Sequence, residues 1–171
     1  QGRMSRLEKE GSEDAMKDRR ALSVLEHALK EIGPQDFSRY QELLKLLRDP
    51  AYTWNYRAAD DRLVIFTERI ETMKWLSEHL QHDLRLPADA IQTLHGGMSD
   101  IDQQKIVEEF GRDEAPVRIL VASDVASEGI NLHYLSHRMI HFDIPWSLMV
   151  FQQRNGRVDR YGQKVSPDIR Y

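Results

Sequence analysis

Residues 60–80 read DDRLVIFTERIETMKWLSEHL, and this stretch decides the fold class. Its first half contains the uninterrupted apolar run Leu63–Phe66, which predicts a strand buried on both faces. In its second half, apolar side chains recur at intervals of three or four residues, which predicts an amphipathic helix; they are Ile70, Met73, Leu76 and Leu80. A buried strand followed by such a helix is typical of a parallel sheet that helices cover on both faces.

The same alternation of short apolar runs and amphipathic segments continues to the end of the chain. It also predicts a helix that Ser99 and Asp102 cap and that ends near Phe110, and a further helix over about residues 148–157. We therefore predict a three-layer α/β domain over residues 58–171 with one hydrophobic core. Its other strands are predicted at residues 91–94, 119–122, 139–142 and 169–171.

A different pattern precedes this domain and predicts a helical extension over residues 15–57. Two stretches with apolar positions at helical spacing lie on either side of Gly33-Pro34, which should end the first helix. An irregular segment that is rich in aromatic residues follows the second helix. Residues 1–14 are polar and are expected to be loose, and Gln1-Gly2-Arg3 resembles the remnant of a cleaved tag.

The composition excludes several classes of function. The 171 residues suffice for one domain of about 100 to 150 residues and an appendage, but not for two such domains. The absence of cysteine excludes disulfides, thiolate nucleophiles and cysteine-ligated zinc. No apolar run approaches the roughly 18 residues of a membrane span, so we expect a cytoplasmic protein. The net charge of -4 indicates that any contact with a nucleic acid is local.

Residues 153–160, QRNGRVDR, carry the strongest functional pattern. Arg157 and Arg160 are three positions apart, which places two guanidinium groups on one side of a helical turn. Gly156 allows a neighbouring backbone or ligand to approach closely. Planar guanidinium groups suit phosphate oxygens. Taken alone, however, the pattern favours a solvated basic helix end that the helix macrodipole stabilises.

Residues 119–132, ILVASDVASEGINL, carry the second pattern, a buried strand that breaks into a small polar loop. Ligands of open α/β sheets bind beyond the carboxyl ends of the strands, which is where this loop would lie. An ordinary strand-to-helix turn that requires Gly129 is the alternative for this loop alone.

Two weaker patterns occur at residues 63–68, LVIFTE, and 93–99, TLHGGMS. In the second, Gly96 and Gly97 would expose backbone amides to a phosphate next to the N-terminus of a helix that begins near Ser99. A buried strand and a tight turn are the alternatives for these two segments.

These four segments together resemble the second, C-terminal lobe of superfamily-two helicases. QRNGRVDR matches the pattern Q-R-x-G-R-x-x-R of motif VI, and residues 119–132 resemble motif V. Residues 63–68 resemble motif IV and residues 93–99 the glycine turn after it, so the segments stand in the family's order. Tyr161-Gly162-Gln163 resembles the Swi/Snf-related branch, particularly its bacterial members. The resemblance implies a RecA-like fold of the P-loop NTPase type, with a parallel sheet and helices on both faces.

The resemblance also implies roles for individual residues. Arg157 and Arg160 would be arginine fingers, which reach across a cleft to the γ-phosphate of ATP held by a first lobe, and Gln153 would lie on the γ-phosphate side. Asp124 would couple the nucleotide site to the nucleic-acid site. Gly129 and Asn131 would lie near the nucleotide, although DEAD-box members commonly carry aspartate in place of Asn131. The nucleic-acid contacts would come from Thr67, Gly96, Gly97 and Ser123.

By the same resemblance, the reaction would be ATP hydrolysis that drives movement along double-stranded DNA. ATP would bind with Mg²⁺ that the first lobe holds, and the partners would be that lobe, double-stranded DNA and a nucleoprotein or polymerase. The chain has no G-x-x-x-x-G-K-[ST] phosphate-binding loop, so we expect it to be inactive as an ATPase on its own. The alternatives are a non-motor module that binds nucleic acid or protein on a RecA-like fold, and an unrelated doubly wound enzyme.

Three further patterns have no role in this prediction. His133, His137 and His141 recur every four residues, but four strand residues span about 13 Å, too far for two ligands of one metal ion, so we predict no metal site. Of the three tryptophans, only Trp146 sits where a ligand could pass, and core packing is favoured there too. Residues 113–116, DEAP, are expected to form a surface loop.

Overall fold

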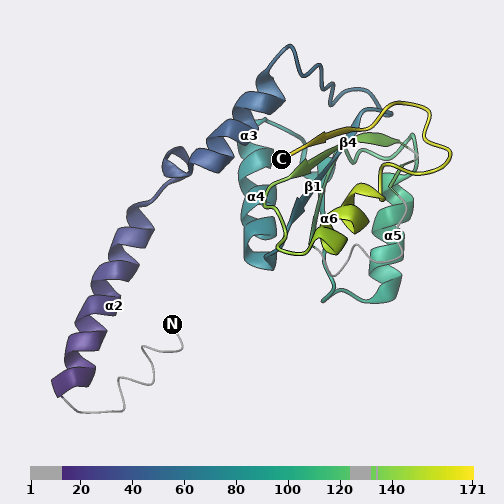
Figure 1. The fold of residues 1–171 in the computed structure, drawn as a ribbon. Helices are drawn as coiled ribbons and strands as arrows, with labels where there is room; N and C mark the ends of the chain where they lie inside the picture. The colour runs from purple at the N-terminus through teal and green to yellow at the C-terminus, as the bar shows by residue number, and fades with distance from the viewer. Residues whose placement is uncertain (1–12, 124–131, 134) are drawn as a thin grey trace. The chain divides into compact units, whose positions relative to one another are not determined.

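The computed structural model describes residues 13–123, 132–133 and 135–171 (Figure 1). The chain divides into two compact units after Glu42, within helix α3 (Ser38–Arg48). The larger unit, Leu43–Tyr171, contains the whole sheet. No helix in the described part of the chain is long and apolar enough to cross a lipid bilayer.

The first unit contains α2 (Glu13–Glu31), the short 3₁₀ helix η1 (Pro34–Asp36) and the start of α3. The predicted interruption at Gly33-Pro34 is confirmed, because α2 ends at Glu31 and Pro34 begins η1. The Gly33 N–H donates to Asp36 Oδ2 at 2.9 Å, and this bond caps the start of η1.

The second unit is built on a parallel sheet with the strand order β2-β3-β1-β4-β5. Central strand β1 pairs with β3 on one side and with β4 on the other. The predicted parallel α/β sheet is therefore confirmed. Its strands are β1 (Arg62–Thr67), β2 (Ile91–Leu94), β3 (Ile119–Ser123), β4 (Ser136–His141) and β5 (Asp168–Arg170).

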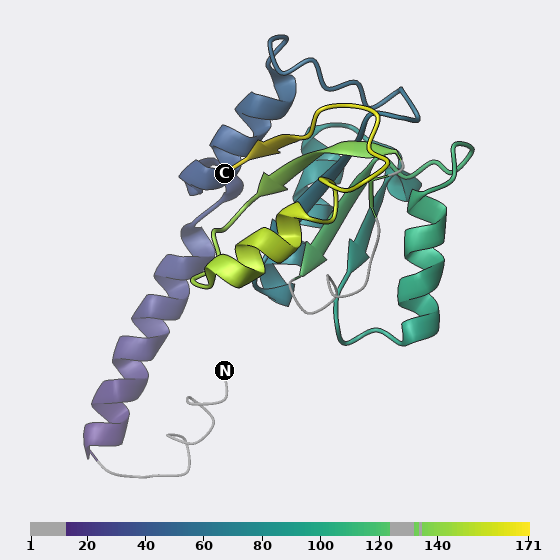
Figure 2. The same cartoon turned by 45° about the vertical axis from the view of Figure 1, so that its right-hand side comes forward.

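Helices cover both faces of this sheet (Figures 1 and 2). Helix α4 (Ile70–Asp83) lies on one face and buries Met73, Leu76 and Leu80, three of the four apolar positions that predicted it. Helix α6 (Leu148–Asn155) lies on the opposite face, and α5 (Asp100–Phe110) contacts β2. The three-layer architecture follows from these positions.

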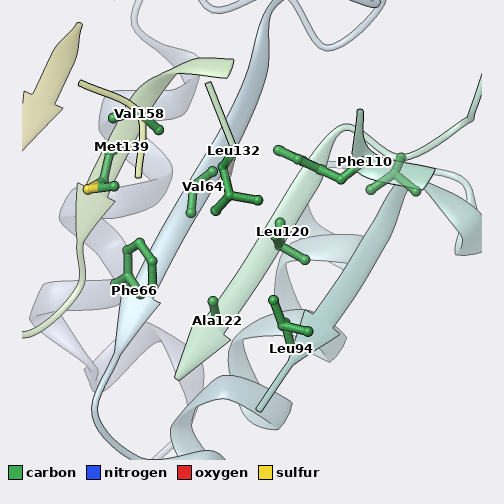
Figure 3. Close-up of a cluster of buried hydrophobic side chains, with 10 residues drawn as sticks. Val64, Phe66, Leu94, Phe110, Leu120, Ala122, Leu132, Met139 and Val158 are labelled. Carbon is green, nitrogen blue, oxygen red and sulfur yellow. The ribbon is translucent and has the colours of Figure 1, made fainter. Parts of the chain in front are cut away.

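A buried hydrophobic cluster fills one side of the sheet (Figure 3). Val64 and Phe66 of β1 and Leu120 of β3 belong to it, because alternate residues of a strand point to the same face. Phe110 from the end of α5 and Val158 from the segment after α6 complete the contacts. Val158 is fully buried, so the segment after α6 is fixed against the sheet.

The start of α5 agrees with the predicted capping signal. The Asp102 N–H donates to Ser99 Oγ at 3.2 Å, so the predicted cap of α5 is confirmed. The short 3₁₀ helix η2 (Ala88–Ala90) before β2 has no counterpart in the prediction. The DEAP segment at 113–116 lies in a largely exposed turn, as expected.

Strand β4 begins at Ser136, three residues before the predicted start at Met139. Its first residues are polar, and the structure satisfies them inside the sheet. Ser136 Oγ donates to Arg62 O at 2.7 Å, and Arg138 Nε donates to Asp61 Oδ1 at 2.6 Å. Polar residues can occupy a buried strand when they are hydrogen-bonded, because the bond offsets most of the free-energy cost of burial. A search for apolar runs therefore misses them.

Residues 43–57, which the sequence assigns to the extension, belong to the second unit. Within them Tyr52 is buried, and the guanidinium carbon of Arg138 lies 4.7 Å from the centre of its ring. Arg138 Nη1 also donates to Tyr52 O at 2.8 Å. Burial raises the pKa of Tyr52 to about 12, and the Asp168 carboxylate acts in the same direction. This cation-aromatic contact joins the segment to β4 at the amino ends of the strands.

Candidate functional site

Four residues with predicted nucleic-acid contacts lie at or just beyond the carboxyl edge of the sheet. Thr67 ends β1 and Ser123 ends β3, and the two are paired in the register of these neighbouring strands. Leu94 ends β2 beside Ala122 of β3, and the turn containing Gly96 and Gly97 follows two residues later. Because all strands are parallel, their carboxyl ends share this edge, which is where open α/β sheets bind ligands.

The Gly96–Gly97 turn is exposed and tightly closed. The Met98 N–H donates to His95 O at 3.1 Å, and the Gly97 N–H donates to His95 Nδ1 at 3.2 Å. A Cβ atom on Gly97 would lie 3.1 Å from His95 Nδ1, so a larger residue there would require the His95 ring to move by a few tenths of an ångström.

Thr67 differs from the glycine turn because its side chain is fully buried. Its hydroxyl donates to Asp143 Oδ2 at 2.5 Å, and both oxygens of the same carboxylate accept from the Glu68 N–H at 2.9 Å. The Thr67 hydroxyl is thus hydrogen-bonded to a carboxylate that follows β4. A direct contact of this hydroxyl with a nucleic acid would require it to leave Asp143.

Ser123 is also buried, with 2% of its surface exposed. Among the described residues its Oγ has no hydrogen-bond partner, which is costly for a buried hydroxyl. Three other predicted site residues follow it, namely Asp124, Gly129 and Asn131, and these lie outside the described part of the chain. Their roles stay predictions.

Arg154 is the residue that the sequence analysis missed. It is fully buried, and its Nη1 and Nη2 donate to Asp143 O at 2.8 Å and to Asp143 Oδ1 at 3.3 Å. Its guanidinium carbon lies 5.6 Å from the centre of the Phe66 ring. The signal was present, since Arg154 is the first arginine of Q-R-x-G-R-x-x-R, but the prediction used only the two later ones.

His141 connects Arg154 to the end of α6. Its Nε2 lies 2.7 Å from Asn155 Oδ1 and therefore carries the proton, while Nδ1 accepts from Arg154 Nη1 at 3.4 Å. The ring also stacks on Phe151, with ring centres 4.6 Å apart. These contacts fix the middle and the C-terminal end of α6 on β4, before the segment with the remaining arginines.

The segment Gly156–Arg160, called the arginine loop below, follows α6. The Asp159 N–H donates to Asn155 O at 2.9 Å, so Arg157 lies in a helix-like turn and Arg160 lies beyond it. The prediction that both guanidinium groups share one helical turn is therefore wrong, because α6 ends at Asn155. Arg157 is half-buried, whereas Arg160 and Gln153 are exposed.

Two features describe the backbone of the arginine loop. The Leu132 N–H donates to Arg157 O at 3.2 Å, which connects the loop to the end of the 119–132 segment. Gly156 has φ -63, a value that any residue can adopt. Among the described residues, a Cβ atom there would contact only carbonyl oxygens of its own helix, at 3.5 and 3.6 Å. The fold itself therefore does not require glycine at 156, and a close approach by another group stays a prediction.

The remaining histidines and tryptophans take separate positions. His137 Nε2 lies 3.7 Å from Asp61 Oδ1, and burial together with Arg138 lowers the pKa of His137. No group of three or more metal-binding side chains is placed to hold an ion within the described ranges. Trp54 Nε1 donates to Asp61 O at 3.0 Å. Trp146 is fully exposed, so the expectation that it packs into the core is wrong.

Residues 38–162 match the family described as helicase conserved C-terminal domain. The chain is 30% identical over 109 residues to the RNA polymerase-associated protein RapA of Vibrio campbellii, an alignment that covers 64% of this chain and 11% of RapA. It is 34% identical over 140 residues to the ATP-dependent RNA helicase DbpA of Bacillus subtilis, which covers 82% of this chain and 26% of DbpA. The chain thus spans only a small part of these relatives.

A solved structure shares the fold. The C-terminal part of the Fun30 ATPase domain has a TM-score of 0.63 to this chain at 23% identity. The superposition covers 77% of this chain and 39% of that one.

Proposed function

Because this chain belongs to the helicase conserved C-terminal domain family, we propose that it is the second motor lobe of an ATP-dependent DNA helicase or translocase. A first lobe of the same polypeptide would bind the ATP phosphates, and this lobe would supply arginine fingers and part of the nucleic-acid track. The observation that carries the proposal is the arginine loop, whose backbone is hydrogen-bonded to Leu132 and whose Val158 is buried in the core, while Arg160 is exposed.

The coarser part of the prediction is confirmed. The chain is a C-terminal lobe of a superfamily-two helicase related to the Swi/Snf branch. Its five-stranded parallel sheet with helices on both faces has the predicted RecA-like fold.

The side chains of Arg157, Arg160 and Gln153 fit a phosphate group, because guanidinium and amide N–H groups donate to anionic oxygens. ATP, when bound, supplies the phosphoryl group that is transferred to water, and Mg²⁺ would be held by the first lobe. Arg157 and Arg160 would neutralise the charge that develops on this group, an effect worth on the order of a thousandfold in rate. Their backbone is already fixed in this lobe, so only the side chains need to adjust when the two lobes close.

The nucleic-acid track would use the carboxyl edge of the sheet. The Gly96–Gly97 turn is exposed, and its backbone could bind a phosphate if the Gly97 N–H exchanged His95 Nδ1 for a phosphate oxygen. At the end of the neighbouring strand lies the Ser123 hydroxyl, which has no partner among the described residues. Trp146, just after β4, adds a fully exposed aromatic ring to the same edge. Such a ring can stack on an unpaired base or insert at a base step.

Double-stranded DNA is the track that we propose, because Tyr161-Gly162-Gln163 resembles the Swi/Snf-related branch. The name of RapA states an association with RNA polymerase, and we extend this to a nucleoprotein or polymerase partner for this chain. The name of DbpA describes an RNA helicase, so RNA is the competing track.

A non-motor module that binds nucleic acid or protein on this fold is the second candidate. Such a module has no use for a γ-phosphate sensor, and the presence of Arg157, Arg160 and Gln153 favours the motor. The two candidates differ in one property, since only the motor loses ATP turnover when an arginine is removed.

The experiment that tests the proposal is ATP turnover by the longer polypeptide with both lobes and by this chain alone. Each is assayed with double-stranded DNA, single-stranded DNA and single-stranded RNA. We expect turnover only with both lobes present and the largest stimulation by double-stranded DNA. Turnover by this chain alone would contradict the proposal. Stimulation by RNA only would support the motor function but show that RNA, not double-stranded DNA, is its track.

A further inference from the structure

Gln163 lies half-buried beside the arginine loop and uses every hydrogen-bonding position of its side chain. Its Nε2 donates to Val158 O at 3.1 Å and to Ser136 O at 2.9 Å. Its Oε1 accepts from the Lys164 N–H at 3.0 Å and from the Val165 N–H at 3.4 Å. One amide therefore joins the middle of the arginine loop to the first residue of β4.

The backbone of Gln163 holds the end of the same loop. The Gln163 N–H donates to Arg160 O at 3.0 Å, which closes a four-residue turn. Gly162 occupies the third position of this turn with φ 98, the position at which a type II turn requires a positive φ. A side chain at 162 would be strained by this φ, although His133 Nε2 at 3.8 Å leaves space for a Cβ atom.

Three successive features therefore restrain the loop that carries Arg157 and Arg160. Arg157 O accepts from Leu132, Val158 O accepts from the Gln163 side chain, and Arg160 O accepts from the Gln163 backbone. Val158 is fully buried, so the loop cannot shift without opening the core. Of these restraints, only the Gln163 side chain reaches both the loop and the sheet.

We propose that Gln163 is a positioning residue for the arginine fingers, whose side chain holds the backbone of Val158, between Arg157 and Arg160, against β4. The inference rests on the proposed function. A carboxamide suits this place because it offers two donors and one acceptor oxygen on one rigid plane. Glutamate at 163 would keep the acceptor but set a carboxylate against two carbonyl oxygens, which would push the loop away.

The test uses single-turnover ATP hydrolysis by the two-lobe polypeptide with Gln163→Ala and Gln163→Glu, each alone and combined with Arg160→Ala. Either Gln163 change alone should lower the rate by about tenfold or more, since misplacing a catalytic group by about 1 Å costs up to a hundredfold. The KM for ATP should change by less than about twofold. In the Arg160→Ala background, the same change should lower the rate by less than about twofold, because residues that act together are not additive.

Thermal unfolding of each variant separates positioning from loss of fold. Gln104→Ala is the matched control, because Gln104 is exposed on α5 and bonds only to Glu108 among the described residues, and its rate should equal that of the wild type. An equal loss of rate in both backgrounds, or no loss in either Gln163 variant while Arg160→Ala is slow, would overturn this inference alone. A normal rate for Arg160→Ala would overturn the proposed finger function and this inference with it.

Discussion

The Thr67 hydroxyl donates a 2.5 Å hydrogen bond to the Asp143 carboxylate, across 76 positions of the sequence. Arg154 donates to the same carboxylate, so a partly buried polar network joins the ends of β1 and β4. The network sits on the edge where a nucleic-acid contact was predicted for Thr67. Because the hydroxyl already has this partner, we expect it to contribute to stability rather than to ligand binding, although its predicted contact stays a prediction.

Replacing Thr67 by valine should therefore destabilise the chain without weakening nucleic-acid binding. Valine preserves the shape but removes one donor from the partly buried Asp143 carboxylate, which should cost about 1 to 3 kcal/mol in the free energy of unfolding. Urea unfolding of this chain measures the loss, and Thr67→Ser, which keeps the hydroxyl, is the control. A variant that unfolds normally but binds DNA weakly would show instead that the hydroxyl contacts the nucleic acid.

Arg154 is expected to be the most sensitive member of this network. Arg154→Met retains much of the side-chain volume but leaves the partly exposed Asp143 carboxylate without its charged partner, which should lower the free energy of unfolding by about 2 to 3 kcal/mol. In the Arg154→Met background, Asp143→Asn should lower the free energy of unfolding by less than it does in the wild type, because the two residues interact directly. Urea unfolding of the single and double variants gives this difference, and additive losses would contradict the pairing.

The polar network of Thr67, Asp143 and Arg154 shows which features sequence patterns can and cannot predict. Strands such as Leu63–Phe66 were predicted because a fully buried strand must be apolar on both faces, and this requirement is visible in the sequence. The Ser99 cap was predicted because its partner Asp102 is three residues away. Arg154 and Asp143 are 11 residues apart and face each other only because α6 folds back over β4. Pairings of this kind depend on the topology of the chain.

Exposure was the other property that the sequence left open. Trp146 was assigned to the core because most tryptophans pack there, yet it lies fully exposed in the connection between β4 and α6. Tyr52 was left in an irregular extension, yet it is buried against Arg138 at a separation of 86 residues. In both cases the neighbour that decides burial comes from a distant part of the chain.

Tyr52 should make stability depend on pH in the alkaline range. Burial raises its pKa to about 12, whereas the unfolded chain releases this proton near pH 10, so the unfolded state becomes favoured as pH rises between these values. Relative to Tyr52→Phe, the wild type should lose up to about 1.4 kcal/mol of unfolding free energy per pH unit in this window. Urea unfolding of both proteins at pH 9, 10 and 11 measures the difference, and parallel pH profiles would contradict it.

Trp146→Ala should weaken nucleic-acid binding while stability is unchanged. The side chain is fully exposed, so its loss should alter the free energy of unfolding by no more than about 0.5 kcal/mol. A ring that stacks on a base contributes about 1 to 3 kcal/mol of binding free energy. Fluorescence anisotropy with labelled DNA and the two-lobe polypeptide measures the loss. Tyr161→Ala is the control, because Tyr161 is equally exposed but lies in the turn beside the amino end of β4. If both variants bind DNA with equal affinity, Trp146 does not contact it.

The most direct measurement is DNA-stimulated ATP turnover by the two-lobe polypeptide with Arg157→Ala and with Arg160→Ala. Each change should lower kcat by about a thousandfold, while the affinity for ATP changes by less than about threefold, because the fingers act on charge that develops during the reaction. Arg112→Ala, at an exposed arginine paired with Glu108, should leave both values unchanged. Wild-type kcat in both finger variants would contradict the proposal that this lobe completes the ATPase site.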